Sequence, residues 1–153
     1  MDASEPDLFE LRLGVFATGA ATAGLAGDAR TLLAGHVPAL AGWSVRMEDG
    51  GAPAAPGDAL TVAELYAELP EQWRVENPGR PPGGRAVHEL RIGVLADPAL
   101  RRGLQDRIAA LACPDPEHTG PCPVPWSSGF TDPGDATRAD LERRYGRLRY
   151  GAH

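Results

Sequence analysis

ELRLGVFA at residues 10–17 recurs as ELRIGVLA at residues 89–96, an offset of 79 residues along the chain. The same register then continues without a gap, so that Leu32 falls on Leu111. A chance likeness between two strand-like octets would not keep its register for so many further residues. The sequence therefore predicts that one structural unit occurs twice.

Each octet has the pattern of a half-buried strand. Leu11, Leu13 and Val15 alternate with small or charged residues, and the second octet alternates in the same way. A period of two places the aliphatic residues on one face of a sheet and Glu, Arg and Gly on the other. A polar second face is not expected where helices cover both sides of a sheet. The pattern thus predicts that this polar face is left uncovered.

A helix and a short strand complete each unit. Apolar residues are spaced as a helical stripe in residues 25–33 and again in residues 98–111. Closing strands are expected at residues 43–47 and at residues 123–126. Prolines at 121, 123 and 125 restrict the second of these to an edge strand or an irregular segment. Two such units predict an α+β fold of ferredoxin-like type, a four-stranded antiparallel sheet with both helices on one face.

The predicted organisation is a single domain over residues 1–153. Its parts are unit one at 9–47, a linker at 48–87, unit two at 88–126 and a tail helix at 135–150.

The linker contains a short helix of its own. Thr61 and Glu64 have the spacing of a capping box, and residues 65–69 provide an apolar side. Pro70 is expected to end this helix. A helix is more than chain closure requires, so it is expected to pack on the rim of the domain or on a partner.

The tail helix is rich in arginine and carries a narrow apolar stripe of Leu141, Tyr145 and Leu148. One interpretation is that the stripe covers an edge of the domain. The other is that the helix docks a protein partner, because Arg and Tyr are favoured at interface hot spots. The partner-binding hypothesis rests on Arg12, Arg91, Arg143, Arg144, Tyr145 and Arg147.

Two further sites are alternatives. Trp43 and Trp126 lie near the closing strands of the two units, and they would line a small-molecule pocket if they approached each other. Cys113, His118 and Cys122 are good zinc ligands in a proline-stiffened loop, although no matching fourth Cys or His stands nearby. The alternative for the two tryptophans and for the cysteine loop is an ordinary structural role in packing. A cofactor is therefore not expected, and zinc is the metal to test.

Composition narrows the function classes. The net charge of −6 argues against non-specific binding to nucleic acid, and no apolar run is long enough to span a membrane. Two cysteines and an acidic N-terminus without a signal pattern predict a cytoplasmic protein. Without a recognisable catalytic set, the sequence favours a non-catalytic interaction or regulatory module that self-associates or docks a protein partner. A small enzyme or ligand-binding protein and a zinc or iron protein remain as alternatives.

Overall fold

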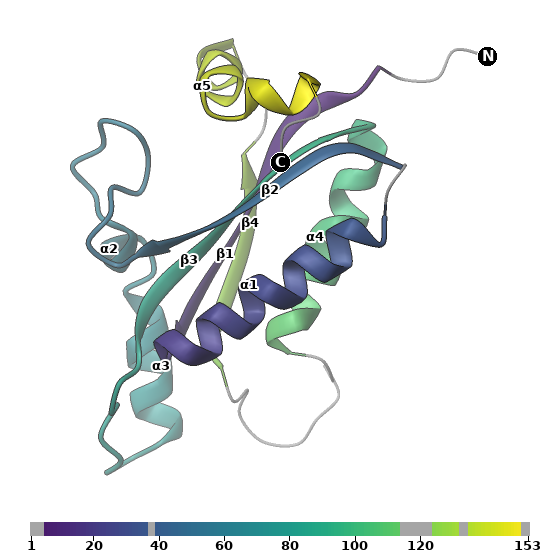
Figure 1. The fold of residues 1–153 in the computed structure, drawn as a ribbon. Helices are drawn as coiled ribbons and strands as arrows, with labels where there is room; N and C mark the ends of the chain where they lie inside the picture. Colours follow the sequence, from purple (N-terminus) through teal and green to yellow (C-terminus); the bar gives the residue numbers. More distant parts are fainter. Residues whose placement is uncertain (1–4, 37–38, 114–123, 132–134, 151–153) are drawn as a thin grey trace.

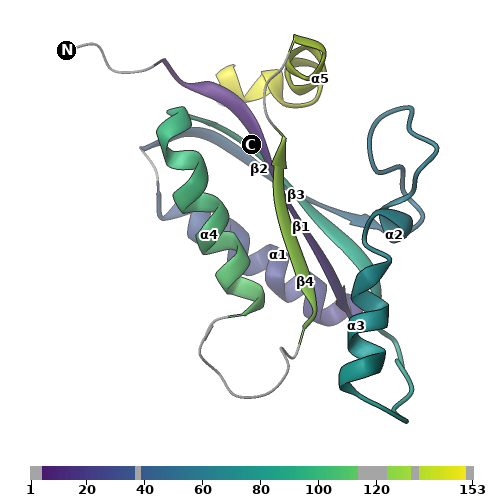
Figure 2. The same cartoon turned by 180° about the vertical axis from the view of Figure 1, so that it is seen from behind.

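The computed structural model describes residues 5–36, 39–113, 124–131 and 135–150 (Figure 1). The chain is α+β, with one four-stranded antiparallel sheet and helices against both of its faces (Figure 2). The predicted class and antiparallel sheet are confirmed. The elements in chain order are β1 (Asp7–Ala17), α1 (Gly19–Ala34), β2 (Leu40–Asp49), α2 (Val62–Leu65), α3 (Glu68–Glu76), β3 (Ala86–Ala96), η1 (Pro98–Leu100), α4 (Arg101–Ala112), β4 (Trp126–Thr131), α5 (Asp135–Tyr145) and η2 (Gly146–Tyr150).

The strands lie in the order β2-β3-β1-β4. The two octets of the repeat are the central pair, β1 and β3, in a register that places Arg12 opposite Arg91. β4 pairs with the other side of β1, from Val15 opposite Trp126 to Glu10 opposite Thr131. The repeated sequences therefore form the middle of the sheet, and β2 and β4 form its edges.

The main core lies between the sheet and the helices α1 and α4 (Figure 1). Leu13, Leu90 and Ile92 from the two central strands have no exposed surface. Leu33 of α1 and Ile108 of α4 close over them, as the helical stripes predicted. Burial of such side chains stabilises the fold by about 1.5–3 kcal/mol each.

The opposite face of the sheet is covered at both ends, which corrects the expectation that it is left open. α2 and α3 pack on Phe16 and Val87 at one end, and α5 with η2 packs on Leu8 and Leu95 at the other. The reason is that this face is polar only in its middle. The residues towards its two ends are apolar, and helices bury them. The buried stripe of Leu141, Tyr145 and Leu148 confirms the interpretation that the tail helix covers a domain edge.

Two predicted boundaries differ. The capping box of Thr61 and Glu64 is present, but Pro70 does not end the linker helix, because it lies in the first turn of α3, where no intrahelical N–H bond is lost. The last strand runs over Trp126–Thr131, so the prediction of residues 123–126 is wrong. The strand begins just after Pro125, because a proline cannot donate to the ladder.

Within the ranges described, no helix combines the length and the apolarity that crossing a bilayer requires.

Candidate functional site

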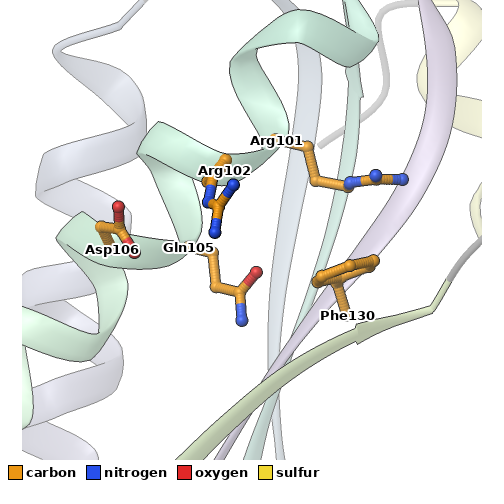
Figure 3. Close-up of a pocket in the computed structure, with 5 residues that line it drawn as sticks. All are labelled: Arg101, Arg102, Gln105, Asp106 and Phe130. Atoms are coloured by element: carbon orange, nitrogen blue, oxygen red, sulfur yellow. The ribbon is translucent and has the colours of Figure 1, made fainter.

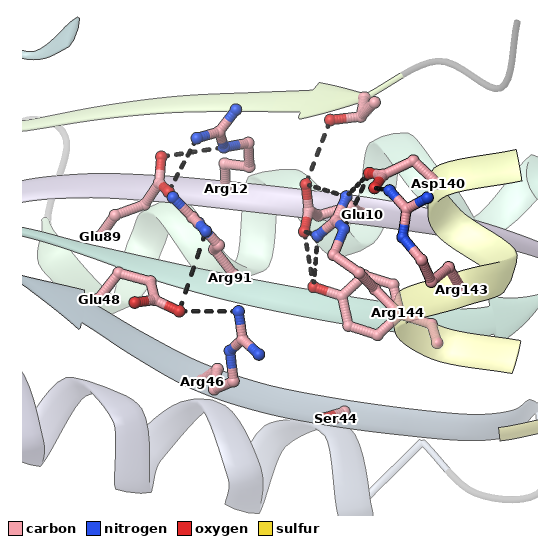
Figure 4. Close-up of polar contacts among 12 residues, drawn as sticks. Glu10, Arg12, Ser44, Arg46, Glu48, Glu89, Arg91, Asp140, Arg143 and Arg144 are labelled. Atoms are coloured by element: carbon pink, nitrogen blue, oxygen red, sulfur yellow. Dashed lines mark hydrogen bonds and ion pairs between the residues drawn. The ribbon is translucent and has the colours of Figure 1, made fainter. Parts of the chain in front are cut away.

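A buried carboxylate lies at the centre of the polar face of the sheet (Figure 4). Glu89 on β3 has no exposed surface. Arg12 donates to both of its oxygens, Nε to Oε2 and Nη2 to Oε1, each at 2.9 Å. Arg91 Nε donates to Oε1 and the Tyr66 hydroxyl donates to Oε2, each at 2.5 Å. Burial alone would raise the pKa of Glu89, but these hydrogen bonds outweigh it and hold that pKa below its usual value.

A second buried carboxylate, Glu10 on β1, has a similar environment 79 residues earlier (Figure 4). The Tyr145 hydroxyl donates to its Oε2 at 2.6 Å, and Arg144 pairs with the same oxygen. Arg144 Nε also donates to Asp140 at 2.8 Å. α5 is thus fixed to the sheet by charge as well as by its apolar stripe.

Both tyrosines lie over glycines of the central strands. The ring of Tyr66 occupies the space that a side chain at Gly14 would need, and the ring of Tyr145 does the same at Gly93. Each tyrosine can therefore lie flat on the backbone while its hydroxyl reaches a carboxylate one strand away. Burial, followed by the negative charge of the adjacent glutamate, raises the pKa of both phenols far above its usual value.

These contacts decide what the predicted partner-binding residues do. Arg12 and Arg91 are held by Glu89, and their remaining donors reach the carbonyls of Ala54 and Pro53 at 2.5 and 2.7 Å. Arg144 and Tyr145 are likewise occupied by Glu10. The guanidinium groups of Arg12, Arg91 and Arg144 are thus paired within the chain, and the Tyr145 hydroxyl is hydrogen-bonded there as well.

Arg143 and Arg147 lie further out on the tail. Arg143 pairs with Asp140 at 2.6 Å with a largely exposed side chain. Arg147 donates to Ser44 Oγ on β2 at 3.3 Å. The structure therefore brings the predicted set together around the polar face, but leaves only these two side chains exposed.

The two tryptophans proposed for a ligand pocket lie on opposite edge strands. Trp43 on β2 is opposite Val94, and Trp126 on β4 is opposite Val15. Both side chains pack partly buried against the main core. The expectation that they approach each other is wrong, because two central strands lie between them.

The zinc hypothesis falls mostly outside the described part of the chain. Cys113 is buried just after α4, whereas His118 and Cys122 lie outside the described residues. Among the residues that are described, no group of three metal-ligating side chains occurs.

The outer edge of β4 is the feature that the sequence did not single out. The Phe16 N–H donates to the carbonyl of Pro125 at 3.1 Å, which fixes the phase of the ladder between β1 and β4. In an antiparallel pair, the N–H and C=O groups of successive residues point alternately towards and away from the neighbouring strand. Those of Trp126, Ser128 and Phe130 therefore point away from β1. No strand in the described ranges lies beyond β4. These groups therefore form an edge that can accept another strand.

A hollow beside this edge, here called the Phe130 hollow, lies between α4 and the end of β4 (Figure 3). Its volume is about 350 Å³, and Arg101, Arg102, Gln105 and Asp106 of α4 line it with Phe130. The Arg101 guanidinium lies over the Phe130 ring at 4.3 Å from its centroid. Phe130 remains 42% exposed, which is high for an aromatic ring on the core face of a sheet.

Two more hollows follow the same strand. The Trp126 hollow lies on the α4 face, where Ala109 and Ala110 face Trp126. The Tyr66 hollow lies on the other face, where Arg12 and Tyr66 face the residues of β4. An extended segment alternates its side chains between two faces, so hollows on both faces suit a strand added at this edge.

One sequence signal could have found β4. Residues 126–131 contain no charged side chain, in a chain whose residues are 24% charged. Natural edge strands are usually protected by charge, proline or a bulge.

No family model matches the chain, and no curated protein matches it. A crystal structure of a hydantoinase/carbamoylase family amidase from Burkholderia ambifaria resembles the fold, with a TM-score of 0.41 and 14% identity. The match covers 94% of this chain and 33% of that one. The chain thus spans about a third of that structure's length, and at this TM-score nothing about function follows from the likeness.

Proposed function

We propose that the chain is a non-catalytic protein-interaction module that receives an extended protein segment along the outer edge of β4. The observation that carries the proposal is the set of outward backbone groups at Trp126, Ser128 and Phe130, with hollows on both faces of the strand. Main-chain bonds would supply affinity, and the hollows would select side chains.

The two Glu-centred clusters support a structural role for the polar face. A general acid or base has to reach a substrate atom. Glu89 and Glu10 are enclosed, and each accepts hydrogen bonds from an arginine and a tyrosine. They would hold the sheet rigid behind the docking edge, which lowers the ordering cost of binding.

We further infer that the fold is a ferredoxin-like duplication longer than the predicted β-α-β unit. Tyr66 and Tyr145 differ by the same offset of 79 as the octets, and so do Leu69 and Leu148. Each half would then be a β-α-β-α unit whose last part lays a tyrosine over a glycine of its own half and bonds a glutamate of the other half. This accounts for the paired glycine, tyrosine and glutamate positions.

The docking edge can be tested with an array of short peptides, applied to the protein at low concentration. The Ser128→Pro variant removes an outward N–H without touching the inward ladder, and should lose the peptides that the wild type binds. Ser128→Ala is the matched control, because it changes the same residue while the outward N–H and C=O remain.

Gly129→Lys is a second variant expected to block peptide binding. Its side chain has room, because no atom lies within 4 Å of a Cβ at Gly129, and it places a positive charge on the edge strand. Peptide binding that survives both Ser128→Pro and Gly129→Lys in folded protein would overturn the proposal. So would a wild type that binds no peptide and no second copy.

A further inference from the structure

The β4 edge, taken as the docking edge proposed above, is suited to one partner in particular. We propose that the strand received there is β4 of a second copy of this chain, antiparallel about a two-fold axis that passes beside Ser128. The outward groups of Ser128 then bond those of the partner's Ser128, and Trp126 and Phe130 bond the partner's Phe130 and the partner's Trp126. Two sheets become one continuous sheet of twice the width.

The side chains of β4 are complementary about this axis. Trp126 and Phe130 lie on the same face and two residues either side of Ser128, so each ring lies opposite the other kind of ring in the partner. Cross-strand aromatic pairs of this sort stabilise sheets. The pairing would bury Phe130, which is 42% exposed in the single chain.

The helix above the strand is complementary in charge. Gln105 Nε2 donates to Ser128 Oγ at 3.5 Å, which places Gln105 near the proposed axis. Arg102 and Asp106 flank it on α4, both are exposed, and neither pairs with any residue in the described ranges. The axis sets the two α4 helices antiparallel side by side, so that Arg102 faces the partner's Asp106 and Asp106 faces the partner's Arg102.

The other edge of the sheet lacks these properties. β2 carries Arg46, Glu48 and Asp49 within four residues, and Arg46 and Glu48 form an ion pair at 2.7 Å. Arg30 also reaches the outer carbonyl of Val45 at 3.5 Å. Charge on an edge strand opposes pairing, so the chain protects β2 and leaves β4 available.

Sedimentation velocity over a range of protein concentrations tests the second copy directly. The wild type should pass from the 16.1 kDa monomer to a dimer as concentration rises. Arg102→Glu and Asp106→Arg should each weaken the dimer about tenfold, because each sets like charges against each other. The Arg102→Glu/Asp106→Arg double variant should restore the dimer, because the exchanged charges again face their opposites.

Each variant should keep the urea midpoint of the monomer, because both side chains are exposed. The proposal of a second copy would be overturned by a wild type that stays monomeric at all concentrations, or by a double variant that dimerises as weakly as the single variants. If peptides from the array still bind and Ser128→Pro still abolishes this, the docking edge stands and only the identity of the partner fails. If peptide binding is absent as well, both proposals fail.

Discussion

Arg12 and Arg91 lie directly opposite each other on β1 and β3, and both donate to the carboxylate of Glu89. Like charges opposite each other normally destabilise a pair of strands. Here the shared carboxylate and the carbonyls of Pro53 and Ala54 offset the repulsion. The centre of the sheet therefore depends on one buried acid.

Replacing that acid should cost much of the stability of the fold. Glu89→Gln removes the acidic partner of Arg12 and leaves Arg91 with only the more distant Glu48, at 3.9 Å, so it should lower the free energy of unfolding by about 3–5 kcal/mol. Urea unfolding followed by circular dichroism measures the change. Glu10→Gln is the matched control and should cost less, because Arg144 keeps Asp140 as a partner. Equal losses, or a loss below about 0.5 kcal/mol for Glu89→Gln, would contradict this account of the cluster.

The stability should fall in acid because of the same residue. The pKa of Glu89 is lowered in the folded chain, so its contribution is fully present above the unfolded value of about 4.3 and is lost as the pH falls through the folded value. The free energy of unfolding of the wild type should therefore drop below that pH. In Glu89→Gln this drop should be shallower, and an unchanged acid limb would argue against the assignment.

Alkali should act through the two buried tyrosines. Their pKa values are raised, so the stability that they contribute is present below about 10 and is lost as the pH rises further. The chain has three tyrosines, and Tyr150→Phe leaves only Tyr66 and Tyr145. In that variant, near-ultraviolet tyrosinate absorbance should rise together with the loss of circular dichroism. Ionisation of Tyr66 and Tyr145 while the protein is still folded would contradict their buried hydrogen bonds to Glu89 and Glu10.

The glycines beneath the tyrosines should not tolerate a side chain. Gly14→Ala and Gly93→Ala place a methyl group in the ring of Tyr66 or Tyr145 and should each destabilise by about 1–3 kcal/mol. Gly27→Ala in α1 is the control, because nothing lies within 4 Å of the new Cβ there and alanine favours a helix. Thermal unfolding should show opposite signs for the two kinds of site. A neutral result at both Gly14 and Gly93 would mean that the rings do not rest on the backbone.

Much of the fold could be predicted from the alternation of the octets. Leu11, Leu13 and Val15 face the main core as the period of two requires. The apolar stripes also predicted the two long helices, and Asp97 caps η1, which leads directly into the second of them, by accepting from Ala99 N at 3.0 Å. Such features depend on near neighbours in the chain, which a sequence displays directly.

The alternation of the octets does not predict the cover of the polar face, because the covering residues lie beyond both predicted β-α-β units, although the offset of 79 reaches them. Extended further, it aligns Tyr66 with Tyr145 and Leu69 with Leu148. The position of the tryptophans could not be read locally, because the strand order that separates Trp43 from Trp126 is a long-range property. The prediction places the last strand too early in the sequence, because the strand begins at Trp126, directly after the prolines.

Hydrogen exchange at single amides of β4 tests most directly whether the outer edge of that strand receives another strand. At low concentration, the amides of Ser127, Gly129 and Thr131 should be protected by β1, and those of Trp126, Ser128 and Phe130 should exchange fast. Raising the concentration, or adding a peptide that the array selects, should protect the second group. Fast exchange of that group under every one of these conditions would contradict the account.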